Sequence, residues 1–384
     1  MRKISDPDLA SELMNWLIGP ARKDCTPEQV VAGLAERLMK AGMRLWRIRI
    51  SQRVSNPLIG AWGVMWTRDG GAEGYTVPRR VLATSSYLGS PFERVMLTRS
   101  FFRRSLENLS ADGDHAVLFE LAETGSTDYV ALPLEYGDGS IQVAAFTTDR
   151  PGGFEADEVA LLECLTSAIA AALEPAAMRY SMRSLLEVYL GNGPAERVVG
   201  GAFHRGDVSE VDAAVLIADL RDFTGLSERT SPPELLEGLG SYFEVVVDAA
   251  REEGGDILKF IGDGVLAVFQ CKGGDICGAC LKAVEATKRA LANEANSPAP
   301  FVVALHFGPV VYGNIGSPDR LDFTVVGSTV NHASRLEGMA KLLGRRAVCS
   351  PEVANALPAG ATEDLGVHML KGFEQPQRVF GLNL

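Results

Sequence analysis

Residues 256–269, Asp-Ile-Leu-Lys-Phe-Ile-Gly-Asp-Gly-Val-Leu-Ala-Val-Phe, decide the fold of the second half of this 384-residue chain. Two apolar runs flank Gly262-Asp263-Gly264. Two strands around a tight glycine-rich turn predict a β-hairpin with one carboxylate at its tip. A Gly-Asp-Gly on its own is an ordinary turn, so its meaning depends on what precedes it.

A second carboxylate ends the strand that comes before this hairpin. Residues 211–217 form an apolar run that predicts a buried strand, and Asp219 follows directly. Residues 231–234, Ser-Pro-Pro-Glu, predict a helix start with a capping box and proline in the first turn. The resulting β-α-β-β order places Asp219 beside Asp263 in a ferredoxin-like sheet. Paired carboxylates suit Mg²⁺ or Mn²⁺, which also bind phosphate oxygens.

The chain after the hairpin predicts further strands and one polar helix. Residues 301–307 and 310–315 predict a strand pair around Gly308-Pro309. Residues 323–335 predict a strand that leads through a turn into a helix, where Asn331 and Arg335 share one face because they are four apart. An amide beside a fixed cation suits a place where negative charge develops on a transferring phosphoryl group. Taken alone, the pair is more typical of an exposed helix surface.

Three motifs in this half together resemble the class III nucleotidyl cyclases. They are Ala-Asp-Leu-Arg-x-Phe-Thr from residue 218, Lys-Phe-Ile-Gly-Asp-Gly from residue 259, and Gly-x-Thr-Val-Asn-x-Ala-Ser-Arg from residue 327. They occur in order between about residue 211 and the C-terminus. The resemblance implies that Asp219 and Asp263 hold two Mg²⁺ or Mn²⁺ ions per active site, with the Leu220 carbonyl as a further ligand.

The same resemblance implies which residues contact the nucleotide. These are Phe223, Thr224, Lys259, Thr324, Asn331, Arg335 and Lys371. Lys259 and Thr324 match two purine-reading positions, and lysine there implies adenine because it donates to a ring nitrogen, whereas a guanine reader usually has glutamate. Asn331 would orient the ribose, and Arg335 would stabilise the transition state. Lys371 matches a lysine that contacts the terminal phosphates.

The implied reaction is attack of the ribose 3′-oxygen of ATP on the α-phosphorus, which yields cyclic AMP and pyrophosphate. In this family the metal aspartates come from one subunit, and the purine readers, asparagine and arginine come from the other. One chain here carries both sets once. The resemblance therefore implies a two-fold homodimer with two shared sites.

Three positions depart from the family pattern, and other functions stay open. Asp222 stands where glycine is common, Pro309 stands where some members carry a pyrophosphate-binding arginine, and Ser328 replaces Asp or Asn. These changes could lower turnover or alter metal preference.

The alternatives are a guanylate cyclase, a diguanylate-cyclase type of transferase, and a catalytically weak nucleotide-binding signalling module. Lys259 argues against guanine, and the Gly-Gly-acid-acid-Phe run of diguanylate cyclases is absent from the sequence.

The first half of the chain predicts a second α+β domain. Helices are predicted at 7–19, 27–41 and 154–173, and strands at 45–50, 61–66, 129–134 and 141–147. This order resembles a GAF-type sensory domain, which would receive an unidentified small-molecule or protein signal. Trp46, Trp62 and Trp66 could line a ligand pocket, although aromatic residues are more often core residues.

Three segments are therefore predicted: a sensory domain over 1–175, a coupling helix and linker over 176–205, and a catalytic domain over 206–384. Residues 177–190 carry an apolar stripe at helical spacing, which suits either a spacer or a two-chain coupling helix. The resemblance to a dimeric family favours a parallel coupling helix, through which the first domain would regulate the second.

Composition limits the function classes further. A formal charge of −12 argues against a nucleic-acid binder, which needs a basic face. No membrane span is predicted, because the apolar run 159–173 is interrupted by Glu163 and expected to stop at Pro175.

Six sparse cysteines suit a reducing compartment, so a cytoplasmic location is predicted. The clustered Cys271, Cys277 and Cys280 leave a redox or metal role open beside simple packing.

Overall fold

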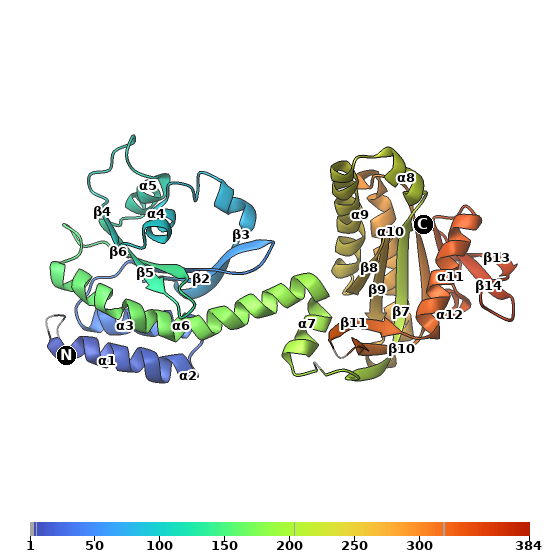
Figure 1. Cartoon of the computed structure of the whole chain (residues 1–384), viewed down its shortest axis with the longest axis horizontal. Helices are drawn as coiled ribbons and strands as arrows, with labels where there is room; N and C mark the ends of the chain where they lie inside the picture. The colour runs from blue at the N-terminus through green and yellow to red at the C-terminus, as the bar shows by residue number, and fades with distance from the viewer. Residues whose placement is uncertain (1–3, 5, 203, 318) are drawn as a thin grey trace. The chain divides into compact units, whose positions relative to one another are not determined.

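The computed structural model describes residues 4, 6–202, 204–317 and 319–384, and it divides the chain into two compact units, Met1–Leu185 and Leu186–Leu384 (Figure 1). Each unit has its own sheet and its own core. The prediction of two α+β halves is confirmed. A separate coupling role for residues 176–205 stays a prediction.

The N-terminal unit is built on a six-stranded antiparallel sheet in the order β3-β2-β1-β6-β5-β4. Its strands are β1 (Arg47–Arg53), β2 (Ile59–Thr67), β3 (Gly71–Pro78), β4 (Phe102–Ser105), β5 (Asp128–Glu135) and β6 (Ile141–Thr148). Its helices are α1 (Pro7–Trp16), α2 (Arg22–Asp24), α3 (Pro27–Lys40), α4 (Pro91–Thr98), α5 (Ala116–Glu123) and α6 (Ala156–Leu190), with a π-helical turn at Leu17–Ala21 and a 3-10 turn at Arg79–Ala83.

Strand β1 shows how this sheet separates its two faces. Ile48 and Ile50 are fully buried in the core that α1, α3 and α6 cover. The neighbouring odd-numbered residues, Arg47 and Arg49, face the opposite side, where α4 and α5 pack on β5 and β6. Buried and partly exposed side chains thus alternate along the predicted strand, and its polar face lies under helices rather than in open solvent.

The tryptophans belong mainly to the α3 and α6 side of this unit. Trp62 and Trp66 are buried in its core, and Trp62 stacks on Tyr180 of α6 with ring centroids 4.8 Å apart. Trp46 lies under the Arg68 guanidinium, 5.2 Å from the ring centroid. Packing and stacking thus account for the three side chains.

Helix α6 differs from the prediction at its end. It continues through Pro175 to Leu190 instead of ending near Leu173. Proline removes one helical N–H, but the preceding turns are fixed by buried side chains such as Leu165 and Ile169, so the helix persists. Among the described residues α6 is also the one helix long and apolar enough to cross a membrane. Half of its most apolar window is buried in the structure, and core helices pass the same test, so the absence of a membrane span stays a prediction.

The C-terminal unit is built on an eight-stranded sheet in the order β13-β14-β12-β10-β7-β9-β8, with β11 paired to β10. Its strands are β7 (Val208–Leu220), β8 (Asp256–Ile261), β9 (Gly264–Gln270), β10 (Phe301–Ser317), β11 (Arg320–Val326), β12 (Ala347–Cys349), β13 (Thr362–His368) and β14 (Gln377–Leu382). Its helices are α7 (Asn192–Val199), α8 (Phe223–Arg229), α9 (Pro232–Glu252), α10 (Ile276–Ala292), α11 (Ser328–Leu342) and α12 (Pro351–Asn355), with 3-10 turns at Lys272–Gly274 and Glu294–Asn296.

The central strand β7 is apolar on both faces because both are covered. Leu216 and Ala218 pack in the core that holds α9 and α10, whereas Val215 packs in the core on the α11 side (Figure 1). The predicted capping box at the start of α9 and the hairpin of β8 and β9 are confirmed.

The predicted strand pair around Gly308-Pro309 is wrong, because β10 is one strand that pairs with β7 on both sides of this dipeptide. The physical reason lies opposite Pro309, at Asp212. The Asp212 carbonyl accepts the Cys271 N–H, so Asp212 directs its backbone groups toward β9 and needs no N–H from Pro309. The Pro309 carbonyl in turn accepts the Thr329 hydroxyl at 2.6 Å. A proline is thus accommodated inside a long strand.

Candidate active site

Asp219 and Asp263 meet where β7 ends and the β8–β9 hairpin turns. Gly262 takes a left-handed φ of 63°, which closes the two-residue turn between Ile261 and Gly264. A Cβ built on Gly264 would lie 3.3 Å from Asp219 Oδ1, so the glycine leaves room for that carboxylate. The two carboxyl groups are close enough to share a hydrogen bond. The structure therefore brings the two predicted metal carboxylates together.

Burial makes this carboxylate pair electrostatically costly. Burial raises the pKa of Asp219, and the Lys341 ammonium acts in the opposite direction. Burial also raises the pKa of Asp263, and the neighbouring Asp219 charge adds to the effect. Two adjacent carboxyl groups with raised pKa values mark a site where Lys341 only partly compensates the negative charge.

Three residues near this pair were missed by the sequence analysis. Lys341 of α11 forms an ion pair with Asp219, and its Nζ lies 2.9 Å from Glu337 Oε1. The Tyr242 side chain is fully buried. Burial raises the pKa of its hydroxyl, and the charges of Asp219 and Asp263 raise this pKa further. The spacing of Glu337 and Lys341 by four residues was a readable signal of a shared helix face. Tyr242 gave none, because it lies in an ordinary apolar helix pattern.

The residues at this pair fit a hard divalent cation. The side-chain donors are carboxylate oxygens, and Leu220 is the adjacent last residue of β7. The Tyr242 hydroxyl is buried without a hydrogen-bond partner, as expected beside a site that a bound ion or its water would complete. No group of three or more His, Cys, Asp or Glu residues is poised to hold a metal among the residues described, so further ligands would have to come from elsewhere. Substrate phosphate oxygens meet that need.

The predicted purine-reading residues lie on β8 and β11, two strands that contact each other without pairing in the sheet. Lys259 of β8 forms an ion pair with Asp322 of β11, and both side chains are partly exposed. Thr324 lies two residues further along β11, on the same face as Asp322, and is buried. The sequence patterns identified Lys259 and Thr324 but not Asp322, whose carboxylate forms the ion pair with the Lys259 ammonium.

Helix α11 presents two different polar faces. Glu337 and Lys341 face Asp219 of the same chain. Asn331 and Arg335 are exposed, and no described residue is hydrogen-bonded to either side chain. Arg335 and Lys341 are six residues apart, which rotates them about 120° from each other around the helix. The structure therefore does not bring Asn331 and Arg335 to the carboxylate pair of their own chain.

The remaining predicted residues occupy loops and helix starts. Phe223 and Thr224 begin α8, where Phe223 packs against the core and Thr224 is exposed. The preceding Asp222 has a left-handed φ of 55°, which explains physically why glycine suits this position, and its carboxylate lies 3.2 Å from Arg229. Ser328 is the exposed first residue of α11. Lys371 is exposed between β13 and β14, and no side-chain contact in the described residues joins it to the other predicted positions.

The cysteine cluster has the character of packing residues more than of a reactive site. Cys280 is buried in the α9 and α10 core, and burial raises the pKa of its thiol to about 12. Burial also raises the pKa of Cys271, and Cys277 is an exposed free thiol. A thiol held protonated is a poor nucleophile and metal ligand.

Comparison with known proteins identifies the family that the second half of the chain matches. Residues 208–382 match the family model of the adenylate and guanylate cyclase catalytic domain. Adenylate cyclase 1 of Rhizobium meliloti is 34% identical over 151 residues, which cover 37% of this chain and 23% of that protein. An adenylate cyclase of Anabaena cylindrica is 32% identical over 163 residues, which cover 40% of this chain and 32% of that protein. The chain thus matches about a quarter to a third of the length of these relatives.

Among solved structures, the crystal structure of the adenylyl cyclase CyaB from P. aeruginosa is 25% identical, with a TM-score of 0.41 over 46% of this chain and 96% of that one. The family match alone assigns residues 208–382, in the C-terminal unit, to an adenylate and guanylate cyclase catalytic domain. The family description covers both adenine and guanine nucleotides, so the choice between them rests on the residues at the site.

Proposed function

We propose that the chain is an adenylate cyclase, which converts ATP to 3′,5′-cyclic AMP and pyrophosphate at a homodimer interface. Asp219, Asp263 and the Leu220 carbonyl would hold two Mg²⁺ or Mn²⁺ ions per site. When bound, such ions would activate the ribose 3′-oxygen and neutralise the leaving pyrophosphate. The N-terminal unit would regulate the reaction in response to a signal.

The residues outside the metal site would bind and orient the nucleotide. Lys259 and Thr324 would read the adenine ring, with Asp322 fixing the lysine ammonium beside them. Asn331 would position the ribose, and Arg335 would neutralise the charge that develops at the α-phosphate. Lys371 would contact the terminal phosphates. Phe223 and Thr224, at the start of α8, would border the triphosphate.

One observation carries the dimer part of the proposal. Helix α11 presents Lys341 to the Asp219 of its own chain, whereas Asn331 and Arg335 are exposed on other parts of the helix surface. An asparagine and an arginine that act beside a carboxylate pair would therefore have to reach the pair of another copy. A two-fold dimer satisfies this requirement for both chains at once.

Exposed apolar side chains beside Lys259 support the same conclusion. Phe260 and Ile261 follow it at the end of β8, and both are exposed. Leu321 and Val326 on β11, the strand that contacts β8, are also exposed. Exposed apolar side chains on two strands that contact each other are compatible with a protein interface at this edge of the domain.

The activity test uses purified full-length chain with Mn²⁺ or Mg²⁺ and either ATP or GTP. We expect cyclic AMP from ATP and much slower turnover of GTP, because Lys259 donates to adenine. Efficient formation of cyclic GMP instead would replace the adenylate assignment with the guanylate alternative. No turnover of either nucleotide would favour a nucleotide-binding signalling module.

The dimer is tested by mixing two inactive variants, Asp219→Ala and Arg335→Ala. Random exchange makes half of the dimers mixed, and each mixed dimer has one intact site of two, so about a quarter of wild-type activity should return. Sedimentation must first confirm that both variants dimerise. Dimeric mixtures that stay inactive would contradict a shared site.

The regulatory part is tested by comparing the full chain with residues 186–384. The fragment should include α7, because Ala195 is fully buried and the Ala202 carbonyl accepts a hydrogen bond from Asn314 of β10. We expect the specific activity of the two proteins to differ. Equal activity of the full chain and a folded, dimeric fragment would contradict control of basal turnover by the N-terminal unit.

A further inference from the structure

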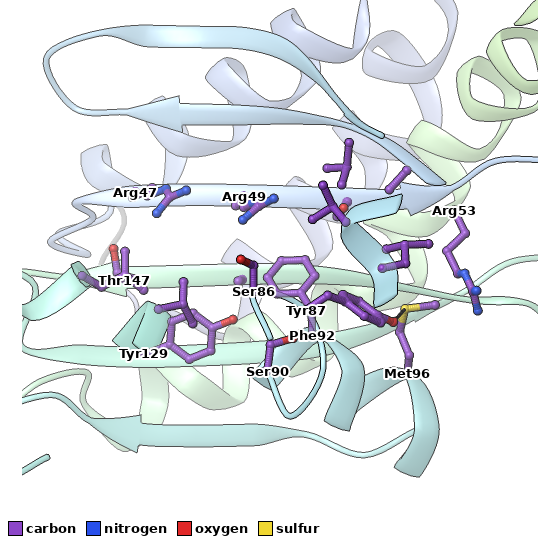
Figure 2. A pocket seen from close by; sticks show the side chains of 18 residues that line it. Arg47, Arg49, Arg53, Ser86, Tyr87, Ser90, Phe92, Met96, Tyr129 and Thr147 are labelled. Carbon is purple, nitrogen blue, oxygen red and sulfur yellow. Dashed lines mark hydrogen bonds between the residues drawn. The ribbon is translucent and has the colours of Figure 1, made fainter. Parts of the chain in front are cut away.

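The N-terminal unit contains a cavity of about 100 Å³ on the face of its sheet that α4 and α5 cover. Arg47, Arg49 and Arg53 reach it from alternate positions of β1 (Figure 2). None of the three tryptophans considered as pocket residues lines it. The cavity is therefore a different feature from the aromatic pocket that the sequence suggested.

Three polar side chains form one row across the floor of this cavity. Arg47 of β1 pairs with Thr147 of β6, and Thr147 pairs with Tyr129 of β5. Residues that are directly opposite on adjacent strands point to the same face of a sheet. All three line the cavity. A guanidinium and two hydroxyl groups thus lie side by side at one end of it.

None of these three polar groups is satisfied within the described protein. Arg47 Nε, Thr147 Oγ1 and the Tyr129 hydroxyl are buried atoms without a hydrogen-bond partner. Tyr129 is only 3% exposed and Thr147 only 2% exposed, so bulk solvent does not substitute for a partner. An unpartnered buried polar group destabilises the folded protein. Three of them in one row are explained if a ligand supplies the missing partners.

The lining of the cavity itself is positively charged, although Glu120, which lies outside the lining, acts on Arg47. Three arginines and no carboxylate line the cavity. Elsewhere in this unit Arg68 pairs with Asp149 and Arg104 pairs with Asp114, but no ion pair joins Arg47 to a carboxylate in the described residues. Burial lowers the pKa of Arg47, and the nearby Arg49 charge lowers it further. The electrostatics therefore favour a bound anion.

The rest of the wall sets the character of that anion. Val77, Leu82, Phe92, Met96 and Val117 line the cavity beyond the arginines. The Arg49 guanidinium lies over the rings of Tyr75 and Phe92, at 4.8 and 5.2 Å from their centroids. Arginine presents a planar fork of donors that matches a carboxylate, while apolar walls suit a hydrocarbon body.

We propose that this cavity binds a small organic carboxylate, whose acidic group contacts Arg47, Thr147 and Tyr129 and whose apolar body packs against Leu82, Phe92 and Met96. This gives a chemical class to the signal in the proposed regulation. Its test measures binding to the N-terminal unit in the full-length chain. It therefore fails or succeeds independently of cyclase activity.

The test titrates the full-length chain by calorimetry with acetate, butyrate, hexanoate, benzoate and phenylacetate. The comparison ligands are phenylacetamide, which is neutral, and phenyl phosphate, which carries the other common anionic group. We expect at least one larger carboxylate to bind at least tenfold more tightly than the amide. No binding of any carboxylate up to about 10 mM would overturn the proposal. Equal binding of the amide, or tighter binding of phenyl phosphate than of every carboxylate, would also overturn it.

Three variants locate the site, with one matched control. Arg47→Met should weaken carboxylate binding at least tenfold, and Arg80→Met should not, because Arg80 is exposed and outside the cavity. Tyr129→Phe and Thr147→Val remove only an unpartnered hydroxyl, so each should weaken binding severalfold while leaving the melting temperature equal or higher. If both hydroxyl variants fold and bind like the wild type, the site is wrong whatever Arg47→Met does.

Discussion

Lys341 forms an ion pair with Asp219, the carboxylate at the end of β7 that we propose as a metal ligand. The same ammonium lies 2.9 Å from Glu337 Oε1, so it neutralises part of a buried acidic group in the absence of metal. A lysine in this position and a divalent cation would draw on the same oxygen. We therefore expect the Lys341–Asp219 ion pair to affect metal binding, unlike an ordinary surface ion pair.

Replacing Lys341 with Met should make Mn²⁺ bind more tightly, by about threefold to tenfold, because a like charge leaves the neighbourhood of the cation. Calorimetric titration of the nucleotide-free protein measures this. Lys282→Met, an exposed change on α10, is the matched control and should have no effect. Unchanged or weaker Mn²⁺ binding in the Lys341 variant would show that the ammonium supports the site rather than competing with the ion.

Asp263→Asn should stabilise the metal-free protein at pH 7.5 while removing cyclase activity. The folded-state pKa of Asp263 is raised by burial and by Asp219. A raised carboxyl pKa adds stability below the ordinary pKa and loses it as pH rises through the folded value, so at pH 7.5 the ionised group is a net cost. We expect the melting temperature of the metal-free variant to lie above that of the wild type.

The same Asp263→Asn variant should lose the rise in melting temperature that Mn²⁺ produces in the wild type, because a metal ligand is gone. Thermal melts with and without Mn²⁺ at pH 7.5 and pH 4 check both expectations. Asp248→Asn, an exposed change on α9, serves as the control. A wild-type response to Mn²⁺ in the Asp263 variant would remove this residue from the metal site.

His332 should make the C-terminal unit less stable in mild acid. Burial, together with the nearby His306, lowers the pKa of His332 to about 4 from an ordinary 6.5. The unfolded chain takes up a proton near pH 6.5 and the folded chain does not, so the free energy of unfolding falls between pH 6.5 and 4, by up to about 3 kcal/mol.

Urea unfolding across this pH range measures the effect. His332→Phe keeps a ring between His306 and Phe373, which lie 4.1 and 4.8 Å away by centroid. It should flatten the decline even if its absolute stability differs. The same slope in the variant and the wild type would assign the acid sensitivity to other groups.

Pro175→Ala should stabilise the N-terminal unit, because it restores a backbone N–H and relieves a steric clash inside α6. The gain should be up to about 3 kcal/mol, the cost of proline in a helix interior. Chemical unfolding measures it, with the solvent-side change Glu163→Ala in the same helix as the control. A loss of stability in the Pro175 variant would contradict this expectation.

Local patterns predicted the parts of the catalytic unit that short sequence rules control. The hairpin around Asp263 and the capping box of α9 follow from residues within a few positions of each other. The continuity of β10 through Pro309 could not be predicted in this way. It depends on the direction of the Asp212 backbone groups on β7, about 100 residues earlier in the chain. Such a long-range contact cannot be predicted from local sequence.

The same distinction applies to the site residues. Asp219, Lys259, Asn331 and Arg335 were found because they stand in motifs. Their close neighbours Lys341, Tyr242 and Asp322 were missed, because their importance comes only from what they touch. In the N-terminal unit the strand at residues 45–50 was predicted, but the local sequence does not show what packs on its arginine-bearing face. Only the packing of α4 and α5 turns part of that face into a cavity.

Alternate residues of strand β1 serve two different functions. Its even positions, such as Ile48 and Ile50, hold the core, and its odd positions, such as Arg47 and Arg49, line the cavity. A one-residue insertion or deletion here would exchange the two faces and bury guanidinium groups among aliphatic side chains. Point substitutions at odd positions leave the core untouched. Relatives of this unit can therefore change the ligand of the cavity by substituting residues on β1. They cannot change the length of the strand without disrupting the core.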